Sequence, residues 1–154
     1  MNNAKALFLD RDGTIIEHVH YINDPAKVVL KKGIAERMLE FQKKGYLLII
    51  VTNQAGIAKG GITPAQYEAV NKKMLELLAE KGIKISEVFM CASHPDDNDP
   101  RRKPEPGMIL EAAKKYEVNL ASSVIVGDSE KDLEAGKRAG VGTRLHVDEF
   151  LKIR

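Results

Sequence analysis

Near its N-terminus the chain reads Ala6-Leu7-Phe8-Leu9-Asp10-Arg11-Asp12-Gly13-Thr14. Four apolar residues followed directly by two carboxylates and a glycine predict a buried strand that ends in a tight turn. Two further apolar runs end in the same way, because residues 46–51 lead into Thr52-Asn53-Gln54 and residues 123–126 lead into Gly127-Asp128. Polar residues therefore recur where the predicted strands end.

Amphipathic stretches separate the apolar runs. Helical spacing of apolar residues, bounded by glycine or Thr-Pro, predicts helices over residues 33–44, 64–81, 107–116 and 131–139. Further strands are predicted over residues 87–91 and 143–147. The alternation of strands and helices predicts a Rossmann-like, three-layer α/β/α fold with a parallel sheet. Because parallel strands end at one edge, where ligands bind, we expect the polar residues to converge there.

The composition is that of one ordinary soluble domain. The 154 residues include 24 Lys and Arg against 22 Asp and Glu, a net charge of +2. We therefore expect a single domain over residues 1–154 and no nucleic-acid partner. The only cysteine, Cys91, excludes an internal disulfide framework. Without a signal peptide or an apolar run near the ~18 residues of a membrane span, we predict a cytoplasmic monomer with no membrane partner.

Two carboxylates two residues apart, Asp10 and Asp12, follow the first predicted strand. Close carboxylates repel each other, and a divalent cation relieves the repulsion. Mg²⁺ takes oxygen ligands and usually one or two protein carboxylates, and Asp128 follows another strand where a third carboxylate is expected. The alternative interpretation is a surface turn rich in aspartate, with Asp128 as a helix N-cap.

Groups that can bind phosphate occur in two places. The Thr52 hydroxyl at the end of a strand can donate to a phosphate oxygen, and the adjacent cations Arg102 and Lys103 can neutralise a phosphate. Asp132 lies one helical turn after Asp128 and could hold either Lys103 or Asp128 in place. The alternatives are a turn-capping threonine and a pair of solvated charges.

Taken together and in this order, these pieces resemble the four motifs of the haloacid dehalogenase (HAD) superfamily of phosphoryl hydrolases. The resemblance implies that Asp10 is the nucleophile that becomes an aspartyl-phosphate, and that Asp12 is the general acid and then the general base. It implies that Thr52 and Lys103 stabilise the phosphate. It also implies a Mg²⁺ cofactor, bound by Asp10, Asp128 and the backbone carbonyl of Asp12.

Three longer strings are similar to the D-glycero-D-manno-heptose 1,7-bisphosphate phosphatases. They are residues 10–14, 52–60 and 102–108. This resemblance implies removal of the C7 phosphate from a small phosphorylated sugar, in the synthesis of activated heptose for lipopolysaccharide. It also implies that four residues contact the sugar or its second phosphate: Asn53, Gln54, Lys59 and Arg102.

HAD proteins often carry a cap domain inserted after the first motif or between the second and third. Residues 14–33 are only about twenty, and residues 54–103 hold one predicted helix, one strand and a loop. Neither segment is long enough to fold as a separate domain. We therefore expect no cap, so that loops must select the substrate.

The sequence departs from the resembling family where that family often binds structural Zn²⁺ through Cys-x-His and a later Cys-x-Cys. Here Cys91 remains, but Ser93 replaces the histidine, and Asp99 and Arg101 occupy the later positions. Zn²⁺ needs four well-placed ligands, and one thiol does not provide them. We predict that the protein has no structural zinc.

A second departure is Ser129, which stands where a lysine often follows the aspartate of the last motif, so one possible phosphate contact is lost. The histidines are not at ligand spacing for one metal. We expect His18 and His146 to have surface or packing roles, whereas His20 and His94 can approach the open site.

Three alternative functions remain open at this point. A histidinol-phosphate phosphatase has nearly the same motifs, and Asp96, Asp97 and Asp99 would suit its cationic substrate. A polynucleotide 3′-phosphatase shares the Thr-Asn-Gln-x-Gly-Ile string at residues 52–57, but aromatics are only 5% of the chain, which disfavours a base-stacking platform. A receiver-like phospho-acceptor would not need the second carboxylate, Asp12.

Overall fold

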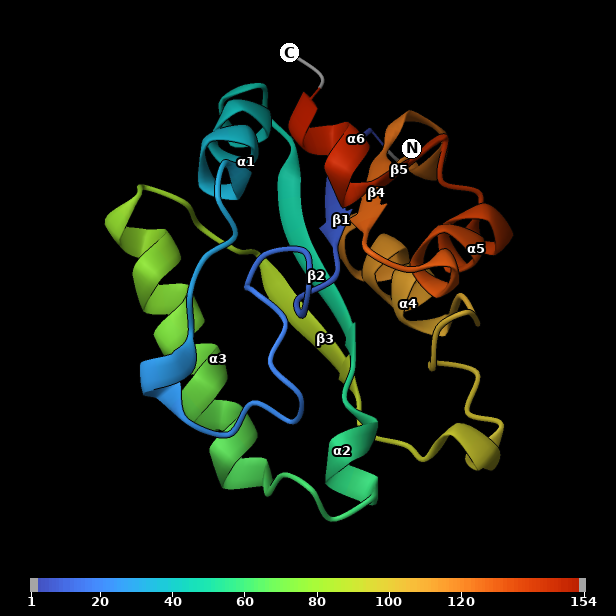
Figure 1. Ribbon diagram of the computed structural model, residues 1–154. Helices are drawn as coiled ribbons and strands as arrows, with labels where there is room; N and C mark the ends of the chain where they lie inside the picture. The colour runs from blue at the N-terminus through green and yellow to red at the C-terminus, as the bar shows by residue number, and fades with distance from the viewer. Residues whose placement is uncertain (1–2, 153–154) are drawn as a thin grey trace.

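Five parallel strands form one sheet in the order β3-β2-β1-β4-β5, in a computed structural model that describes residues 3–152. The strands are β1 (Ala6–Leu9), β2 (Leu47–Asn53), β3 (Glu87–Cys91), β4 (Val124–Gly127) and β5 (Thr143–His146). Helices cover both faces of this sheet (Figure 1), which confirms the predicted three-layer α/β/α fold. The predicted domain, residues 1–154, also includes residues 1–2 and 153–154, which lie outside the described residues.

The α-helices within residues 3–152 are α1 (Ile34–Lys43), α2 (Ala55–Ala58), α3 (Pro64–Glu80), α4 (Gly107–Tyr116), α5 (Glu130–Ala139) and α6 (Val147–Lys152). The sequence pattern does not predict α2, which is too short to show helical periodicity. It also places Val147 in a strand, whereas Val147 begins α6. His146 explains the difference, because its Nδ1 accepts a hydrogen bond from the Asp148 N–H (3.1 Å) and so caps the new helix.

Successive residues of the central strand alternate between two hydrophobic cores. Leu7 and Leu9 of β1 pack in the core that α1, α3 and α6 cover, whereas Ala6 and Phe8 pack in the core that α4 and α5 cover (Figure 1). All four side chains are fully buried. A strand buried on both faces must be apolar at every position, which is why the sequence shows a continuous run there.

The strand register brings the ends of β1, β2 and β4 side by side. Leu9, the last residue of β1, pairs with Ile50 on one side and with Val126 on the other. The Asp10 N–H then donates to the Val126 carbonyl at 3.1 Å. Asp10 therefore lies between the segments of chain that leave β2 and β4, as the parallel topology requires.

The segments that could carry a cap belong to the main fold. Residues 14–33 contain one 3₁₀ turn, Pro25–Lys27, whereas residues 54–103 contain α2, α3, β3 and the 3₁₀ turn Pro95–Asp97. Since β3 is a strand of the sheet and α3 covers one of its faces, the described residues include no separate cap. Within residues 3–152, no helix combines the length and the apolar character needed to cross a lipid bilayer.

Candidate active site

Three hollows that share lining residues open around the carboxyl edge of the sheet. The Asp10 hollow, about 350 Å³, is lined by residues that include Asp10, Asp12, Asn53, Lys103, Asp128 and Asp132. The Tyr21 hollow, about 220 Å³, is lined by residues that include His18, His20, Tyr21 and Gln54. The Arg138 hollow, about 350 Å³, is lined by residues that include Asn98, Asp99, Glu105 and Arg138. Arg102 lines all three.

Lys103 is a buried cation that lines the Asp10 hollow. Its ammonium group donates to Asp10 Oδ1 at 3.1 Å, to Asp132 Oδ1 at 2.5 Å and to the Val51 carbonyl at 2.7 Å. The Asn53 amide fixes the backbone of Lys103, since it donates to the Lys103 carbonyl (3.0 Å) and accepts from the Lys103 N–H (3.1 Å). Residues far apart in the sequence thus hold one positive charge beside Asp10.

The electrostatics of the Asp10 hollow favour a second cation. Burial, and to a smaller extent the carboxylates of Asp132, Asp12 and Asp128, raise the pKa of Asp10 from its ordinary 3.8 to about 7, although Lys103 lowers it. Burial lowers the pKa of Lys103, but Asp10 and Asp132 outweigh it and hold that pKa above its ordinary value. Lys103 therefore stays charged, whereas Asp10 needs more positive charge to be ionised well below neutral pH.

Arg11 positions the carboxylate of Asp12. The Arg11 guanidinium donates to both Asp12 oxygens at 3.1 Å, and Gln54 Nε2 donates to Asp12 Oδ2 at 2.8 Å. Arg11 is itself buried, because it donates to Asn71 Oδ1 at 2.9 Å and lies over the Tyr67 ring. Sequence reasoning missed Arg11 and Asn71. The one available signal was an arginine between two aspartates at the end of a buried strand.

Some of the remaining predicted residues line the hollows, whereas others do not. Thr52 is fully buried at the end of β2 and lines none of the three hollows, and its hydroxyl accepts from Gln54 Nε2 at 2.9 Å. Gln54 lines the Tyr21 hollow. Lys59 is exposed at the end of α2, outside all three linings. His18, expected at the surface or in packing, lines both the Asp10 and the Tyr21 hollows.

Three carboxylates form a cluster that fits a hard cation. Oxygen atoms of Asp10, Asp128 and Asp132 lie within 4.8 Å of one another. Lys103 and a backbone N–H bind the two oxygens of Asp132, which leaves Asp10 and Asp128 to take a metal ion. Gly13, with φ of +79°, lies so close to Asp128 that a Cβ there would collide with Asp128 Oδ2. This set of oxygen donors suits Mg²⁺.

The four positions at which the resembling family places zinc ligands bind one another. Asp99 accepts hydrogen bonds from the Ser93 hydroxyl, from the Cys91 thiol at 3.5 Å and from the Arg101 N–H at 2.8 Å. The Ser93 hydroxyl and the Arg101 N–H hold the pKa of Asp99 below its ordinary value. These side chains do not offer four metal ligands, because Arg101 is a cation and Ser93 is a neutral donor.

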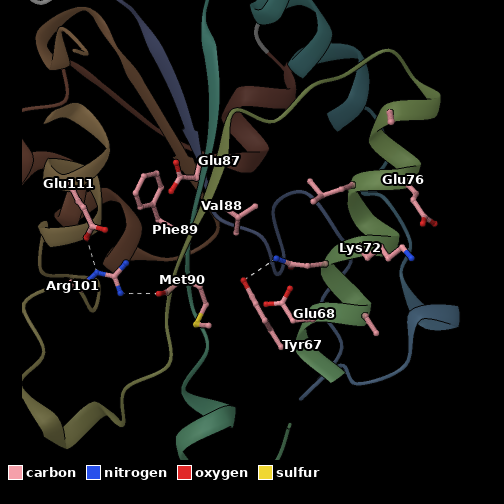
Figure 2. A pocket seen from close by; sticks show the side chains of 14 residues that line it. Tyr67, Glu68, Lys72, Glu76, Glu87, Val88, Phe89, Met90, Arg101 and Glu111 are labelled. Carbon is pink, nitrogen blue, oxygen red and sulfur yellow. Dashed lines mark hydrogen bonds and ion pairs between the residues drawn. The ribbon is translucent and has the colours of Figure 1, made fainter. Parts of the chain in front are cut away.

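A larger hollow, about 1000 Å³, lies between α3 and the edge strand β3 (Figure 2). Arg101 forms part of its lining, where it donates to the Met90 carbonyl at 3.0 Å and to Glu111 at 2.8 Å. No residue that lines this hollow also lines the Asp10 hollow. We therefore do not take this larger hollow as the candidate active site, because the clustered carboxylates and buried Lys103 line the Asp10 hollow instead.

The chain matches the protein family described as polynucleotide kinase 3 phosphatase over residues 5–141. That range includes every residue that lines the Asp10 hollow. The chain belongs to this phosphatase family. The candidate active site thus lies within the segment that matches the family.

Two curated relatives extend the family assignment. The D-glycero-beta-D-manno-heptose-1,7-bisphosphate 7-phosphatase of Mesorhizobium japonicum is 43% identical over 152 residues, covering 93% of this chain and 69% of the relative. The D-glycero-alpha-D-manno-heptose-1,7-bisphosphate 7-phosphatase of Photorhabdus laumondii is 39% identical over 147 residues, covering 91% and 80%. These identities confirm the resemblance to the heptose bisphosphate phosphatases.

Solved structures of phosphatases have the same fold. A HAD-like phosphatase from Mesorhizobium loti superposes with a TM-score of 0.87 at 42% identity, covering 91% of this chain and 70% of that structure. The D,D-heptose 1,7-bisphosphate phosphatase of B. bronchiseptica, complexed with magnesium and phosphate, has a TM-score of 0.85 at 34% identity, covering 90% and 78%. Both confirm that the chain is a HAD-like phosphatase.

Proposed function

We propose that this phosphatase removes the C7 phosphate of D-glycero-D-manno-heptose 1,7-bisphosphate, with Mg²⁺ as cofactor. The observation that carries the proposal is the ion pair of buried Lys103 with Asp10, in a hollow that Asp12 and Asp128 also line. A fixed cation beside a nucleophilic carboxylate stabilises the charge of the phosphoryl group during transfer. The substrate follows from the curated relatives, which are heptose bisphosphate 7-phosphatases.

In the first step, the Asp10 carboxylate attacks phosphorus and the bond between phosphorus and the C7 oxygen breaks. The Asp12 carboxyl group gives its proton to the leaving oxygen, so that the sugar departs as an alcohol and Asp10 carries an acyl phosphate. Arg11, which binds both Asp12 oxygens, stabilises the Asp12 carboxylate that remains. Lys103 keeps one Asp10 oxygen in place throughout.

In the second step, water attacks the phosphorus of the aspartyl-phosphate. Asp12 takes a proton from this water, and the bond between phosphorus and the Asp10 oxygen breaks, which regenerates both carboxyl groups and releases inorganic phosphate. Asp10, Asp128 and the backbone carbonyl of Asp12 would hold Mg²⁺. When bound, Mg²⁺ neutralises charge on the transferred phosphoryl group and favours the ionised form of Asp10.

The lining of the hollows favours a sugar phosphate over histidinol phosphate. A cationic substrate needs an acidic rim, but Asp96 and Asp97 line none of the three hollows. Asp99 does line the Arg138 hollow, yet Ser93 and Arg101 already bind its oxygens. Of the acidic residues that kept this alternative open in the sequence, two therefore line none of the hollows, and the oxygens of the third are already hydrogen-bonded.

A polynucleotide 3′-phosphatase is the second candidate, since the matched family is described by that activity. The sequence indicates no stacking platform, whereas in the structure His20 and Tyr21 stack with ring centroids 4.1 Å apart and both line the Tyr21 hollow. A stacked pair of rings can bind a base or the apolar face of a sugar. This observation makes an oligonucleotide a necessary arm of the substrate test.

Further proposals concern the protein as a whole. We infer that residues 1–154 form one domain that works as a cytoplasmic monomer, and that the loop between β3 and α4 needs no zinc. The last inference is supported by the hydrogen bonds that Cys91, Ser93 and Arg101 make to Asp99. Size-exclusion chromatography with light scattering tests the monomer, and metal analysis of the purified protein tests the zinc content.

The substrate test is a comparison of kcat/KM for phosphate release with Mg²⁺ present. The substrates are both anomers of heptose 1,7-bisphosphate, histidinol phosphate and a 3′-phosphorylated oligonucleotide. We expect a heptose bisphosphate to be the best substrate, and Asp10→Asn to lower its kcat by at least about 10³-fold. Asp148→Asn, a change at an exposed aspartate of α6, is the matched control. A faster oligonucleotide reaction would replace the proposed substrate, and an active Asp10→Asn variant would remove the nucleophile.

A further inference from the structure

Two cations at the Asp10 hollow have no carboxylate partner among residues 3–152. Lys131 and Arg102 line both the Asp10 hollow and the Arg138 hollow. Among the interactions of residues 3–152, neither side chain takes part in an ion pair. The Nη1 atom of Arg102 is moreover buried without a hydrogen-bond partner. A buried, unpaired guanidinium nitrogen is costly unless a ligand completes it.

The other charges of the Arg138 hollow are already compensated. Arg138 pairs with Glu105 of the same hollow at 2.5 Å. Asp99 accepts from the Ser93 hydroxyl and from a backbone N–H. Lys103 is bound between the carboxylates of the Asp10 hollow. The uncompensated charge of the Arg138 hollow is therefore positive and comes from two side chains, which suits a dianionic phosphate group.

The Tyr21 hollow offers less positive charge. Its lining includes two arginines, Arg11 and Arg102. Arg11 is fully engaged by Asp12, Gln54 and Asn71, so Arg102 alone remains for a ligand. Lys59, which the sequence indicated as a contact for the sugar or its second phosphate, lies outside this lining as well.

The position of Lys131 in α5 is unusual for a lysine. Lys131 is the second residue of α5, directly after the N-cap Ser129 and Glu130. A cation in the first helical turn faces the positive end of the helix dipole. Glu130 and Asp132 share that turn, but Lys103 and a backbone N–H already bind the two oxygens of Asp132. The lysine that often follows the last-motif aspartate is absent at position 129, but Lys131, two residues later, also places a positive charge in the lining of the Asp10 hollow.

We propose that Lys131, together with Arg102, binds the phosphate that is not transferred and holds it in the Arg138 hollow. The inference rests on the proposed function, since it assumes that the transferred phosphate occupies the Asp10 hollow. Lys131 is then a substrate-binding residue that sets the preference for a sugar bisphosphate over a monophosphate. Lys131 thus has the role, contact with the second phosphate, that the family resemblance implied for Lys59.

The test compares heptose 1,7-bisphosphate with heptose 7-phosphate. We expect Lys131→Ala to raise KM for the bisphosphate about tenfold with kcat little changed, because one charge-assisted contact is lost. The effect on heptose 7-phosphate should be much smaller, because this substrate has no second phosphate. Lys131→Arg, which keeps the charge, should restore most of the preference. Lys137→Ala removes the same charge from an exposed lysine of the same helix and should leave both substrates unaffected.

An equal effect of Lys131→Ala on both substrates, or no effect on either, would overturn the inference. A wild-type protein that hydrolyses neither sugar phosphate would refute the proposed function instead. In that case, isothermal titration of the same two compounds into wild-type and Lys131→Ala protein with Mg²⁺ still decides the matter. Preferential binding of the bisphosphate that depends on Lys131 supports the assignment, and binding that is absent or independent of Lys131 contradicts it.

Discussion

Mg²⁺ and protons should compete for the Asp10 carboxylate, so the affinity for Mg²⁺ should depend on pH. Burial and neighbouring carboxylates raise the pKa of Asp10 to about 7. Because this pKa lies above the ordinary 3.8, the folded protein binds the Asp10 proton more tightly than the unfolded chain does. The contribution of Asp10 to the free energy of unfolding therefore falls as the pH rises from about 4 to about 7. Only the ionised carboxylate can take the metal.

The size of the effect follows from the ionised fraction. With a pKa of about 7, Asp10 is about 3% ionised at about pH 5.5 and about 90% ionised at about pH 8. The apparent affinity for Mg²⁺ should therefore be about 30-fold higher at the higher pH. Magnesium should correspondingly raise the thermal midpoint much more at about pH 8, where it relieves the repulsion among the carboxylates.

Isothermal titration of Mg²⁺ at the two pH values measures this ratio directly. Asp10→Asn should bind Mg²⁺ weakly at both and lose most of the pH dependence. His18 lines the same hollow, so His18→Gln changes a neighbouring side chain, leaves Asp10 in place and should keep the ratio. Glu111→Gln is the control for a distant carboxylate. A wild-type ratio below about threefold would refute the link between burial of Asp10 and metal binding.

Three other predictions concern the stability of the site. Lys103→Met should lower the free energy of unfolding by about 3–5 kcal/mol at about pH 8, because two buried carboxylates lose their cation. Urea unfolding measures this loss, which should be smaller at low pH. Gly13→Ala should cost more than Gly45→Ala, since both backbones are left-handed but only a Cβ at Gly13 meets Asp128; equal thermal midpoints would contradict the collision. A zinc-selective chelator should leave the thermal midpoint unchanged, and a clear drop would show that the loop around Asp99 holds zinc.

The sequence predicts the strands, the main helices and the shared edge with good accuracy, because these depend on local patterns. An uninterrupted apolar run such as residues 6–9 indicates burial on both faces, and parallel topology then brings Asp10 and Asp128 together at one edge. Lys103 reaches the same place although its loop has no periodicity. The resemblance to known motifs predicted that convergence, and periodicity alone does not.

The sequence pattern does not predict the role of a side chain when that role depends on contacts with residues distant in the chain. Arg11 reads as a turn residue, yet Asn71 and Tyr67, both on α3, bury it. Lys59 and Lys131 are both exposed lysines near the ends of helices, and nothing in their local sequence says which one faces a hollow. The direction in which a helix or loop leaves the sheet settles that, and this direction is set by tertiary packing between elements distant in the chain. Local patterns therefore determine which elements form, whereas tertiary packing determines which charges meet the substrate.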